Sequence, residues 1–394
     1  MTKILYPTHI LAGLALAGAA AVTPLPAANG DIPIYQPTTI TAPGRYVVTR
    51  DITAQGDVIV LQSGGVSLDL NGHTITSITG SGVVLDLVGA VVPIDDVANG
   101  RIVGGVTGIK GVNIPAGTTL IVDKVGITGP IDDCIDMPGP ARVVVRDSVL
   151  RGCGRDGIRM TGNGNGLLEC KGTHILDVNG NGIFASSTEG VIVRGSTIRG
   201  FAGTIGPIDN AGVRLVAPGK LGLSVLDSVI VEGGAQGVGV LLELAGGTGP
   251  IDLRGNTIAG NGASGIDLRQ GAARITGNTI AANLGDGIRV DAAGTGPIDL
   301  KDNSILGNTL NGVDIRAGVV RLNGNTVGGN LQNGVIVAGA RALVESNFLE
   351  GNGGVGLKFL NGTGHAYRGN FLRGNTGGDV QDPFSNTDAG GNIK

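Results

Sequence analysis

The chain has 394 residues, of which 74 are glycine, 15% are charged and 3% are aromatic. Because glycine is enriched and charge is depleted relative to ordinary soluble proteins, we expect a chain that turns often and fills its core with Ile, Val, Leu and Ala. The net charge of −4 and the absence of any Lys/Arg run argue against a nucleic-acid partner.

The first 28 residues have the features of a cleavable signal peptide. Lys3 precedes an apolar stretch from Ile10 to Val22, and small residues follow up to Ala28. A membrane anchor is the alternative, but the apolar stretch is shorter than the about 20 residues that span a bilayer. We therefore expect a secreted or periplasmic protein with no membrane span after signal cleavage, and we expect a monomer.

Residues 29–72 are expected to form an N-terminal cap and the first strands. The segment from Thr38 to Ile75 alternates apolar and polar residues, but it is out of register with the later repeats. Such a segment can start a solenoid and cover its first open edge. At the other end, residues 381–394 are polar, and we expect a loose C-terminal tail there.

Three cysteines follow in the first half of the chain: Cys134, Cys153 and Cys170. Export permits disulfides, but an odd number leaves one thiol over. The three residues show neither CxxC spacing nor a neighbouring histidine, so a metal site is not indicated. We interpret them as packed thiols, among which one bridge can form.

A repeat occupies residues 73–380 and is clearest in the C-terminal half. Its leading asparagines recur every 22 to 25 residues, and a second asparagine follows five residues after each. The first column contains Asn256, Asn278, Asn303, Asn325, Asn347 and Asn370, and the second contains Asn261, Asn283, Asn308, Asn330, Asn352 and Asn375. Because stacked coils lie about 4.8 Å apart, identical amides can hydrogen-bond along such a column.

Each repeat contains three short alternating segments, such as Ile251–Gly255, Thr257–Ala259 and Gly265–Arg269. One coil cannot bury its own apolar side, so neighbouring coils must cover it. The same register extends towards the N-terminus with Ser or Thr in place of the leading asparagine, at Ser148, Thr173, Ser196 and Ser228. The pattern predicts an all-β, single-stranded solenoid of roughly a dozen coils with asparagine ladders.

These motifs, together with NGHTI at residues 71–75 and the exported context, resemble the right-handed parallel β-helix repeat proteins of the pectate-lyase-like superfamily, including NosD-like periplasmic proteins. The resemblance spans about residues 38–378 and implies a right-handed helix. Members of that superfamily include polysaccharide lyases, glycoside hydrolases, epimerases and non-catalytic surface proteins, so the fold does not choose among these activities.

Charged residues alternate in sign on the strand that begins with the recurring Gly-Ile motif. Four are candidate substrate-binding residues: Arg214, Glu243, Arg269 and Arg316. The resemblance implies that this face carries the substrate cleft, and chain insertions beside it are expected to wall a groove, at 200–207, 217–223, 245–250 and 292–297. An ionic lattice that only fixes the coil register is the alternative.

Four residues of the same face are catalytic candidates: Asp267, Arg289, Asp291 and Asp314. Asp267 and Asp291 are expected about 8 Å apart, which suits an inverting pair of carboxyl groups. Neighbouring arginines would keep both carboxylates ionised, however, whereas a general acid needs a raised pKa.

An earlier acidic cluster is a candidate calcium site. Asp133 and Asp156 are expected to adjoin at a turn, and paired carboxylates suit Ca²⁺. The alternative is that both are turn residues that bind the backbone. No other cofactor is indicated.

A separate outward column is basic, and it contains Arg146, Lys171, Arg194, Arg254, Lys301 and Arg368. It could attract acidic polysaccharide or be ordinary solvated surface. Our leading hypothesis is an exported β-helix whose partner is a polysaccharide or a cell-surface glycan, with catalysis left open: a lyase or a glycoside hydrolase if it is an enzyme. The alternatives are a non-catalytic structural or surface protein and, less favoured, a NosD-like accessory protein.

Overall fold

The computed structural model describes residues 30–88, 94–162, 165–202, 210–217, 219–243, 249–269, 271–291, 296–339, 341–361, 364–384 and 386–394. The predicted signal peptide, residues 1–28, lies outside this part. Within these ranges every regular element is a β-strand, and the strands pair in parallel in a 28-stranded and a 15-stranded sheet. None of these ranges contains a helix with the length and apolarity needed to cross a membrane.

A complete coil contributes a first and a second strand to the 28-stranded sheet, and a third strand to the 15-stranded sheet. The first strands are β1 (Ile32–Ile34), β3 (Gly44–Val48), β6 (Val66–Asp69), β9 (Ile94–Gly104), β11 (Thr119–Thr128), β13 (Arg142–Arg146), β16 (Leu167–Lys171), β19 (Gly190–Arg194), β22 (Gly222–Leu226), β25 (Ile251–Arg254), β28 (Ala273–Thr276), β31 (Pro297–Lys301), β34 (Val319–Asn323), β37 (Arg341–Glu345), β40 (Ala366–Arg368) and β43 (Thr387–Asp388). In β9 and β11 the first and second strands are continuous.

The second strands are β4 (Ile52–Ala54), β7 (Thr74–Ser77), β14 (Val149–Arg151), β17 (His174–Leu176), β20 (Thr197–Arg199), β23 (Val229–Val231), β26 (Thr257–Ala259), β29 (Thr279–Ala281), β32 (Ser304–Leu306), β35 (Thr326–Gly328), β38 (Phe348–Glu350) and β41 (Phe371–Arg373). The third strands are β2 (Thr38–Ile40), β5 (Ile59–Leu61), β8 (Ser81–Asp86), β10 (Thr107–Val112), β12 (Ile135–Pro138), β15 (Ile158–Thr161), β18 (Ile183–Ser186), β21 (Ala211–Val216), β24 (Val238–Glu243), β27 (Ile266–Leu268), β30 (Ile288–Asp291), β33 (Val313–Ala317), β36 (Val335–Val337), β39 (Leu357–Phe359) and β42 (Val380–Gln381).

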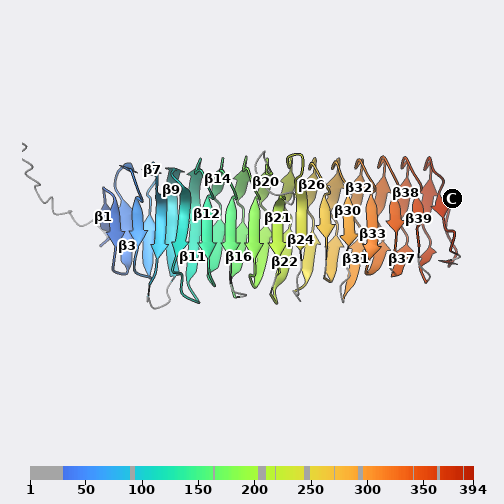
Figure 1. Cartoon of the computed structure of the whole chain (residues 1–394), viewed down its shortest axis with the longest axis horizontal. Coiled ribbons are helices and arrows are strands. Elements are labelled where there is room, and N and C mark those ends of the chain that lie inside the picture. Colours follow the sequence, from blue (N-terminus) through green and yellow to red (C-terminus); the bar gives the residue numbers. More distant parts are fainter. Residues whose placement is uncertain are drawn as a thin grey trace, which may run out of the picture.

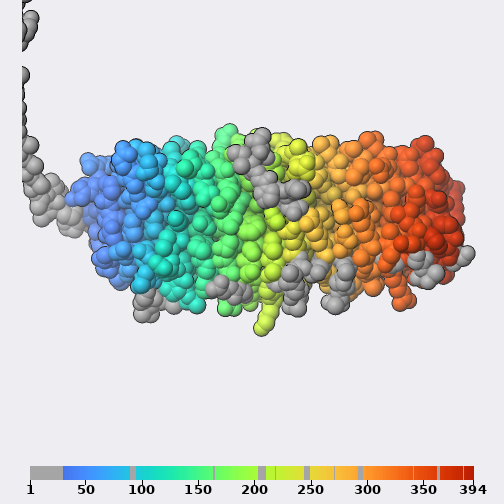
Figure 2. All heavy atoms as spheres, viewed as in Figure 1, coloured from blue at the N-terminus to red at the C-terminus, as the bar shows by residue number. Residues whose placement is uncertain are grey.

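The coils stack into an elongated rod of about 14 turns (Figures 1 and 2), which confirms the predicted parallel β-solenoid and slightly exceeds the expected coil number. Pairing runs without a break across residue 72, because β6 and β7 both pair with β9. At the C-terminal end, β43 pairs with β40 and the Asn370 side chain donates to the Asn392 side chain at 3.0 Å.

Alternation along each strand places apolar side chains inside the rod, as predicted. Ile258 and Ile280 face each other across neighbouring second strands, and Ile266 and Ile288 do so across third strands. All four are fully buried. Each coil therefore depends on its neighbours for its core, and the stability of the rod is a sum of coil-to-coil contacts.

Both predicted asparagine ladders form. In the first, the Nδ2 of Asn278 donates to the Oδ1 of Asn303 at 3.0 Å and also to the backbone oxygen of Leu253. In the second, the Nδ2 of Asn283 donates to the Oδ1 of Asn308 at 3.0 Å. The amides are buried and satisfy one another and the turn backbone, so the spacing in the sequence reflects a physical requirement of stacking.

The expected Ser/Thr extension of the first ladder is also confirmed. The N–H of Ser228 donates to the Oδ1 of Asn256, and the N–H of Ser196 donates to the Oγ of Ser228. The N–H of Thr173 donates to the Oγ of Ser196, which is buried like the asparagines of later coils. A hydroxyl thus replaces the amide in the same turn.

The glycine of the Gly-Ile motif is required by packing against the second ladder. A Cβ on Gly265 would lie 2.7 Å from Ile280 and 2.8 Å from the Nδ2 of Asn283 in the next coil. In one earlier coil the corresponding pair is Cys134 and Cys153, which form a disulfide with a Cα–Cα distance of 5.4 Å.

The third cysteine, Cys170, is a free thiol in the core. Burial raises its pKa to about 11, so it is unreactive as a thiol. Of the three cysteines, two are therefore bridged and one is an ordinary packed residue.

Candidate functional site

The outward surface of the third strands, here called the third-strand face, has the predicted register. Arg159, Phe184 and Arg214 lie side by side on β15, β18 and β21, and Asp267, Arg289 and Asp314 do so on β27, β30 and β33. One detail differs from the expected pattern, because the register shifts between β30 and β33 so that Asp291 faces Ala317. Arg316 is therefore not in line with Asp291.

The predicted substrate-binding residues of the middle coils bind one another. The Glu243 carboxylate accepts the Nη2 of Arg214 at 2.8 Å and the Nη1 of Arg269 at 2.7 Å. Arg269 also contacts Asp267 at 3.2 Å. These charges are largely neutralised within the protein.

The four catalytic candidates lie together but in unequal surroundings. Asp267 and Asp314 are almost fully buried, and Arg316 holds Asp314 at 2.7 Å. Asp291 is exposed and pairs with Arg289 at 3.2 Å. The catalytic assignments stay predictions.

Asp267 differs from the expectation that its arginine neighbours keep it readily ionised. Burial raises its pKa, and this outweighs the opposing effect of Arg269 and Arg289. Its Oδ1 atom is buried and has no hydrogen-bond partner among the residues that the structure describes. The cost of desolvating a carboxylate thus exceeds the gain from its ion pair, which charge spacing in the sequence does not reveal.

A hollow opens on the third-strand face towards the N-terminal side of these ion pairs, with a volume of about 410 Å³. The half-buried ring of Phe184 forms part of its lining, together with Asp132, Arg155 and Asn210. The Arg159 and Arg214 guanidinium groups lie 4.9 and 5.6 Å from the ring centroid.

This hollow was not predicted from the sequence. The available signal was a single aromatic residue placed in register between two arginines. Leu241, in line with Arg214 on the next strand, is fully buried in a small apolar cluster with Ala211 and Val238. The open surface therefore lies beside Phe184 and does not continue over Leu241.

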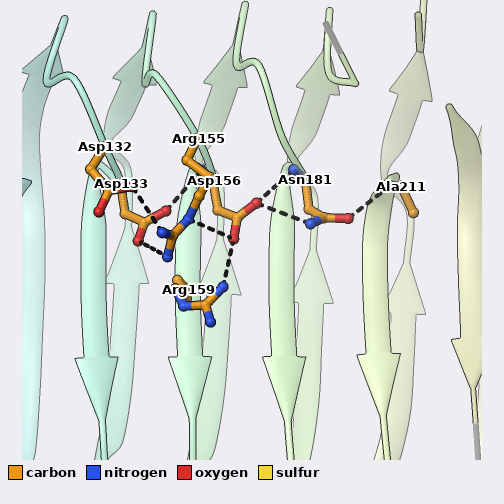
Figure 3. A network of polar contacts seen from close by, with 7 residues as sticks. All are labelled: Asp132, Asp133, Arg155, Asp156, Arg159, Asn181 and Ala211. Atoms are coloured by element: carbon orange, nitrogen blue, oxygen red, sulfur yellow. Dashed lines mark hydrogen bonds and ion pairs between the residues drawn. The ribbon is translucent and has the colours of Figure 1, made fainter. Parts of the chain in front are cut away.

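Of the two calcium candidates, Asp156 lines this hollow and Asp133 is fully buried, and Figure 3 shows the contacts that hold both side chains. The Oδ1 of Asp133 accepts the backbone N–H of Asp156 at 2.9 Å, and its Oδ2 accepts the Nη2 of Arg155 at 2.9 Å. The Oδ1 of Asp156 accepts both the backbone N–H and the Nδ2 of Asn181, at 2.7 and 3.0 Å. The Oδ1 of Asn181 in turn accepts the N–H of Ala211.

This arrangement is a third polar ladder, in which each side chain binds the turn of the following coil. Burial raises the pKa of Asp133 to about 7, and the hydrogen bond that Asp133 accepts from the backbone of Asp156 opposes this rise.

The carboxylate oxygens of the calcium candidates are mostly occupied. Three of the four oxygens of Asp133 and Asp156 accept an N–H at 3.0 Å or less. In the described ranges no group of three His, Cys, Asp or Glu residues is arranged to hold a metal ion. The calcium site at Asp133 and Asp156 stays a prediction.

The insertions that were expected to wall the groove lie partly outside the described residues. The omitted positions are 203–209, 218, 244–248 and 292–295.

A family model described as the right-handed β-helix region matches residues 110–319, which is more than half of the chain. The chain belongs to this right-handed β-helix family. The match agrees with the parallel coils and with the predicted handedness. No curated protein sequence matches the chain.

Several solved structures are similar in outline at low sequence identity. A point mutant of the periplasmic alginate epimerase AlgG is 14% identical, with a TM-score of 0.49 over 80% of this chain and 75% of that chain. The A-module of the Azotobacter vinelandii mannuronan C-5 epimerase AlgE6 is 13% identical, with a TM-score of 0.42 over 89% and 90%. The catalytic domain of a GH87 alpha-1,3-glucanase is 14% identical, with a TM-score of 0.24 over 92% and 64%.

Proposed function

We propose that this protein binds a polysaccharide or cell-surface glycan on the third-strand face, with the hollow around Phe184 as a sugar subsite. The observation that carries the proposal is an accessible aromatic ring flanked by two guanidinium groups in a concave surface. An aromatic ring offers an apolar surface to a sugar ring, while arginine offers several N–H donors to hydroxyl or carboxylate oxygens.

Arg159 is the better placed of the two arginines to bind a ligand. Its hydrogen bond to Asp156 uses Nη1 at 3.4 Å. Arg214 is held by Glu243 through both Nε and Nη2, at 3.0 and 2.8 Å. We infer that Arg214 fixes one side of the ring and that Arg159 supplies donors to the ligand.

Binding is better supported than catalysis on this face. Asp267 and Asp314 are almost completely buried, whereas a group that protonates a glycosidic oxygen must reach it. The Cys134–Cys153 bridge supports an oxidising compartment, in keeping with the proposed secreted or periplasmic location.

The test is binding of polygalacturonate, alginate and neutral dextran to the wild type and to Phe184→Ala and Arg159→Gln. Loss of contacts worth about 1.4 kcal/mol weakens binding about tenfold, and we expect each substitution to have that effect. Phe348→Ala is the matched control, because Phe348 is stacked on Phe371 outside this hollow.

If wild-type protein binds none of the three polysaccharides, or if both variants bind as well as wild type, the proposal fails and the structural alternative gains support. Assays for unsaturated and reducing products, with and without Ca²⁺, test processing. A Ca²⁺-dependent activity that is lost in Asp133→Asn and Asp156→Asn would support the calcium assignment.

A further inference from the structure

A trough follows the outward surface of the first strands from β25 to β40, here called the first-strand trough. It consists of three adjoining hollows that all include Asp299, and the principal one has a volume of about 450 Å³. Its charged lining contains Asp252, Arg254, Arg274, Asp299, Lys301, Arg321 and Arg341. It is built on different strands from the hollow at Phe184.

A column of alternating charge forms the floor of the trough. Asp252 faces Arg274, Arg274 faces Asp299, and Asp299 faces Arg321 on successive strands. Neighbouring strands are about 4.8 Å apart, so like charges recur about every 10 Å along the rod. Arg254 and Lys301 come from the basic column that the sequence indicated, whereas the alternating column was not predicted.

The charges in the trough are less neutralised than those on the third-strand face. Arg254 binds Asp252 at 2.6 Å, and Arg321 binds Glu345 at 3.1 Å. Arg274, in contrast, is exposed and makes no ion pair or side-chain hydrogen bond with the described residues, and the same holds for the half-buried Asp299. Five cations against two carboxylates leave the lining positive.

The chemistry of the lining favours one class of ligand. A nucleic acid would meet carboxylates in the floor, and the described lining residues include no aromatic side chain on which a base could stack. A linear acidic polysaccharide presents carboxylates and hydroxyls in turn. Its carboxylates can accept hydrogen bonds from arginine, and its hydroxyls can donate to aspartate.

We propose that the first-strand trough is a second binding site, for a linear carboxylate-bearing polysaccharide that lies along the rod axis. Arg274 and Arg321 bind carboxylates of the chain, and Asp299 between them accepts a sugar hydroxyl. The site is separate from the hollow at Phe184 and does not require the proposed function of that hollow.

The experiment places an environment-sensitive fluorophore in the trough through Thr276→Cys. Thr276 lines the principal hollow, and the one free native thiol, Cys170, is buried. The labelled protein is titrated with polygalacturonate, with its methyl-esterified form and with poly-L-glutamate. We expect a saturable response to polygalacturonate that is at least about tenfold weaker for the other two polymers, since one lacks the charge and the other lacks the hydroxyls.

Substitutions in the labelled protein then test the residues. Arg274→Gln is expected to weaken the polygalacturonate response about tenfold, and Asp299→Asn is expected to reduce the preference for polygalacturonate over poly-L-glutamate. Arg194→Gln removes an exposed first-strand arginine outside the trough, so it controls for general charge. Phe184→Ala is expected to leave this response unchanged, which separates failure of this site from failure of the hollow.

Three outcomes would overturn the inference: no response to polygalacturonate, equal responses to polygalacturonate and poly-L-glutamate, or equal losses in Arg274→Gln and Arg194→Gln. Thermal unfolding of each variant verifies folding. Arg274→Lys, which keeps the charge but not the forked donors, should retain part of the response even if Arg274→Gln proves unstable.

Discussion

The turn that follows the second strand is built differently in the two halves of the rod. In the C-terminal half it holds the second ladder, from Asn261 to Asn375. In the N-terminal half the corresponding positions are Cys153, Val178, Phe201 and Gly233. The backbone places them in one column, since the N–H of Asn179 donates to the Cys153 oxygen as the N–H of Leu284 donates to the Asn261 oxygen.

Stacking of the coils therefore requires that the second-ladder position be filled and that its polar groups be hydrogen-bonded. An amide side chain is not required there. Amides satisfy each other in the C-terminal half, the Cys134–Cys153 bridge fills the position in one coil, and an aromatic ring does so in another. A Cβ on Gly233 would lie 2.6 Å from Phe201, so glycine makes room for the ring.

The largest expected effect concerns pH, through the third ladder. Its N-terminal part uses Asp133 and Asp156, whereas Asn311 and Asn333 occupy the column in later coils. The folded pKa of Asp133, about 7, exceeds its ordinary value of 3.8, so the folded state binds more protons between these values. Its contribution to stability is therefore greatest below about pH 4 and is lost as the pH rises towards 7, by on the order of 4 kcal/mol.

Asp133→Asn should remove that part of the pH dependence. We expect urea titrations to show the variant gaining stability relative to wild type as the pH rises from 4 to 7. Asp302→Asn, at an exposed position, is the control. Parallel pH profiles for wild type and Asp133→Asn would show that this ladder is not the source.

The disulfide gives the second largest expected effect. Replacing Cys134 and Cys153 by serine opens a loop of 19 residues and should lower the free energy of unfolding by about 3 kcal/mol. Because solenoid contacts are local, hydrogen exchange should increase in the neighbouring coils and not beyond residue 300. Uniform loss of protection along the rod would contradict this.

A second variant sharpens the comparison of the halves. Cys134→Gly with Cys153→Asn installs the residue pair of the C-terminal coils, but Val178 in the next coil offers no side-chain acceptor. We expect it to be no more stable than the double serine variant. Recovery of wild-type stability would mean that an isolated amide suffices.

The smallest expected effect comes from comparing an asparagine with a serine of the first ladder. The Oδ1 of Asn303 accepts both the N–H and the Nδ2 of Asn278. Asn303→Ala therefore leaves the backbone N–H of Asn278 unpaired and removes one acceptor of its Nδ2, and it should cost about 2 kcal/mol. The Oγ of Ser196 accepts one N–H, from Thr173, so Ser196→Ala should cost about 1 kcal/mol. Denaturant unfolding measures both, and the reverse order would contradict the ladder argument.

The repeat in the sequence determined the coil period, the inward and outward faces and both asparagine ladders. These features follow from the stacking of coils, which aligns equivalent residues of successive repeats independently of the loop conformations. It also indicated that Ser196 and its neighbours replace asparagine. The sequence alone did not pair Cys134 with Cys153. They occupy the positions of the motif glycine and the second-ladder asparagine, and only the structure shows that these two positions are in contact.

The tertiary structure alone decided which charges are free to act. Alternating signs on the third strands suggested a binding floor, but Glu243 binds Arg214 and Arg269, and burial changes Asp267. The register shift at Asp291 and the hollows at Phe184 and Asp299 are likewise visible only in the folded chain. Periodicity fixes where a side chain points, whereas its exposure and its partner depend on every neighbour in three dimensions.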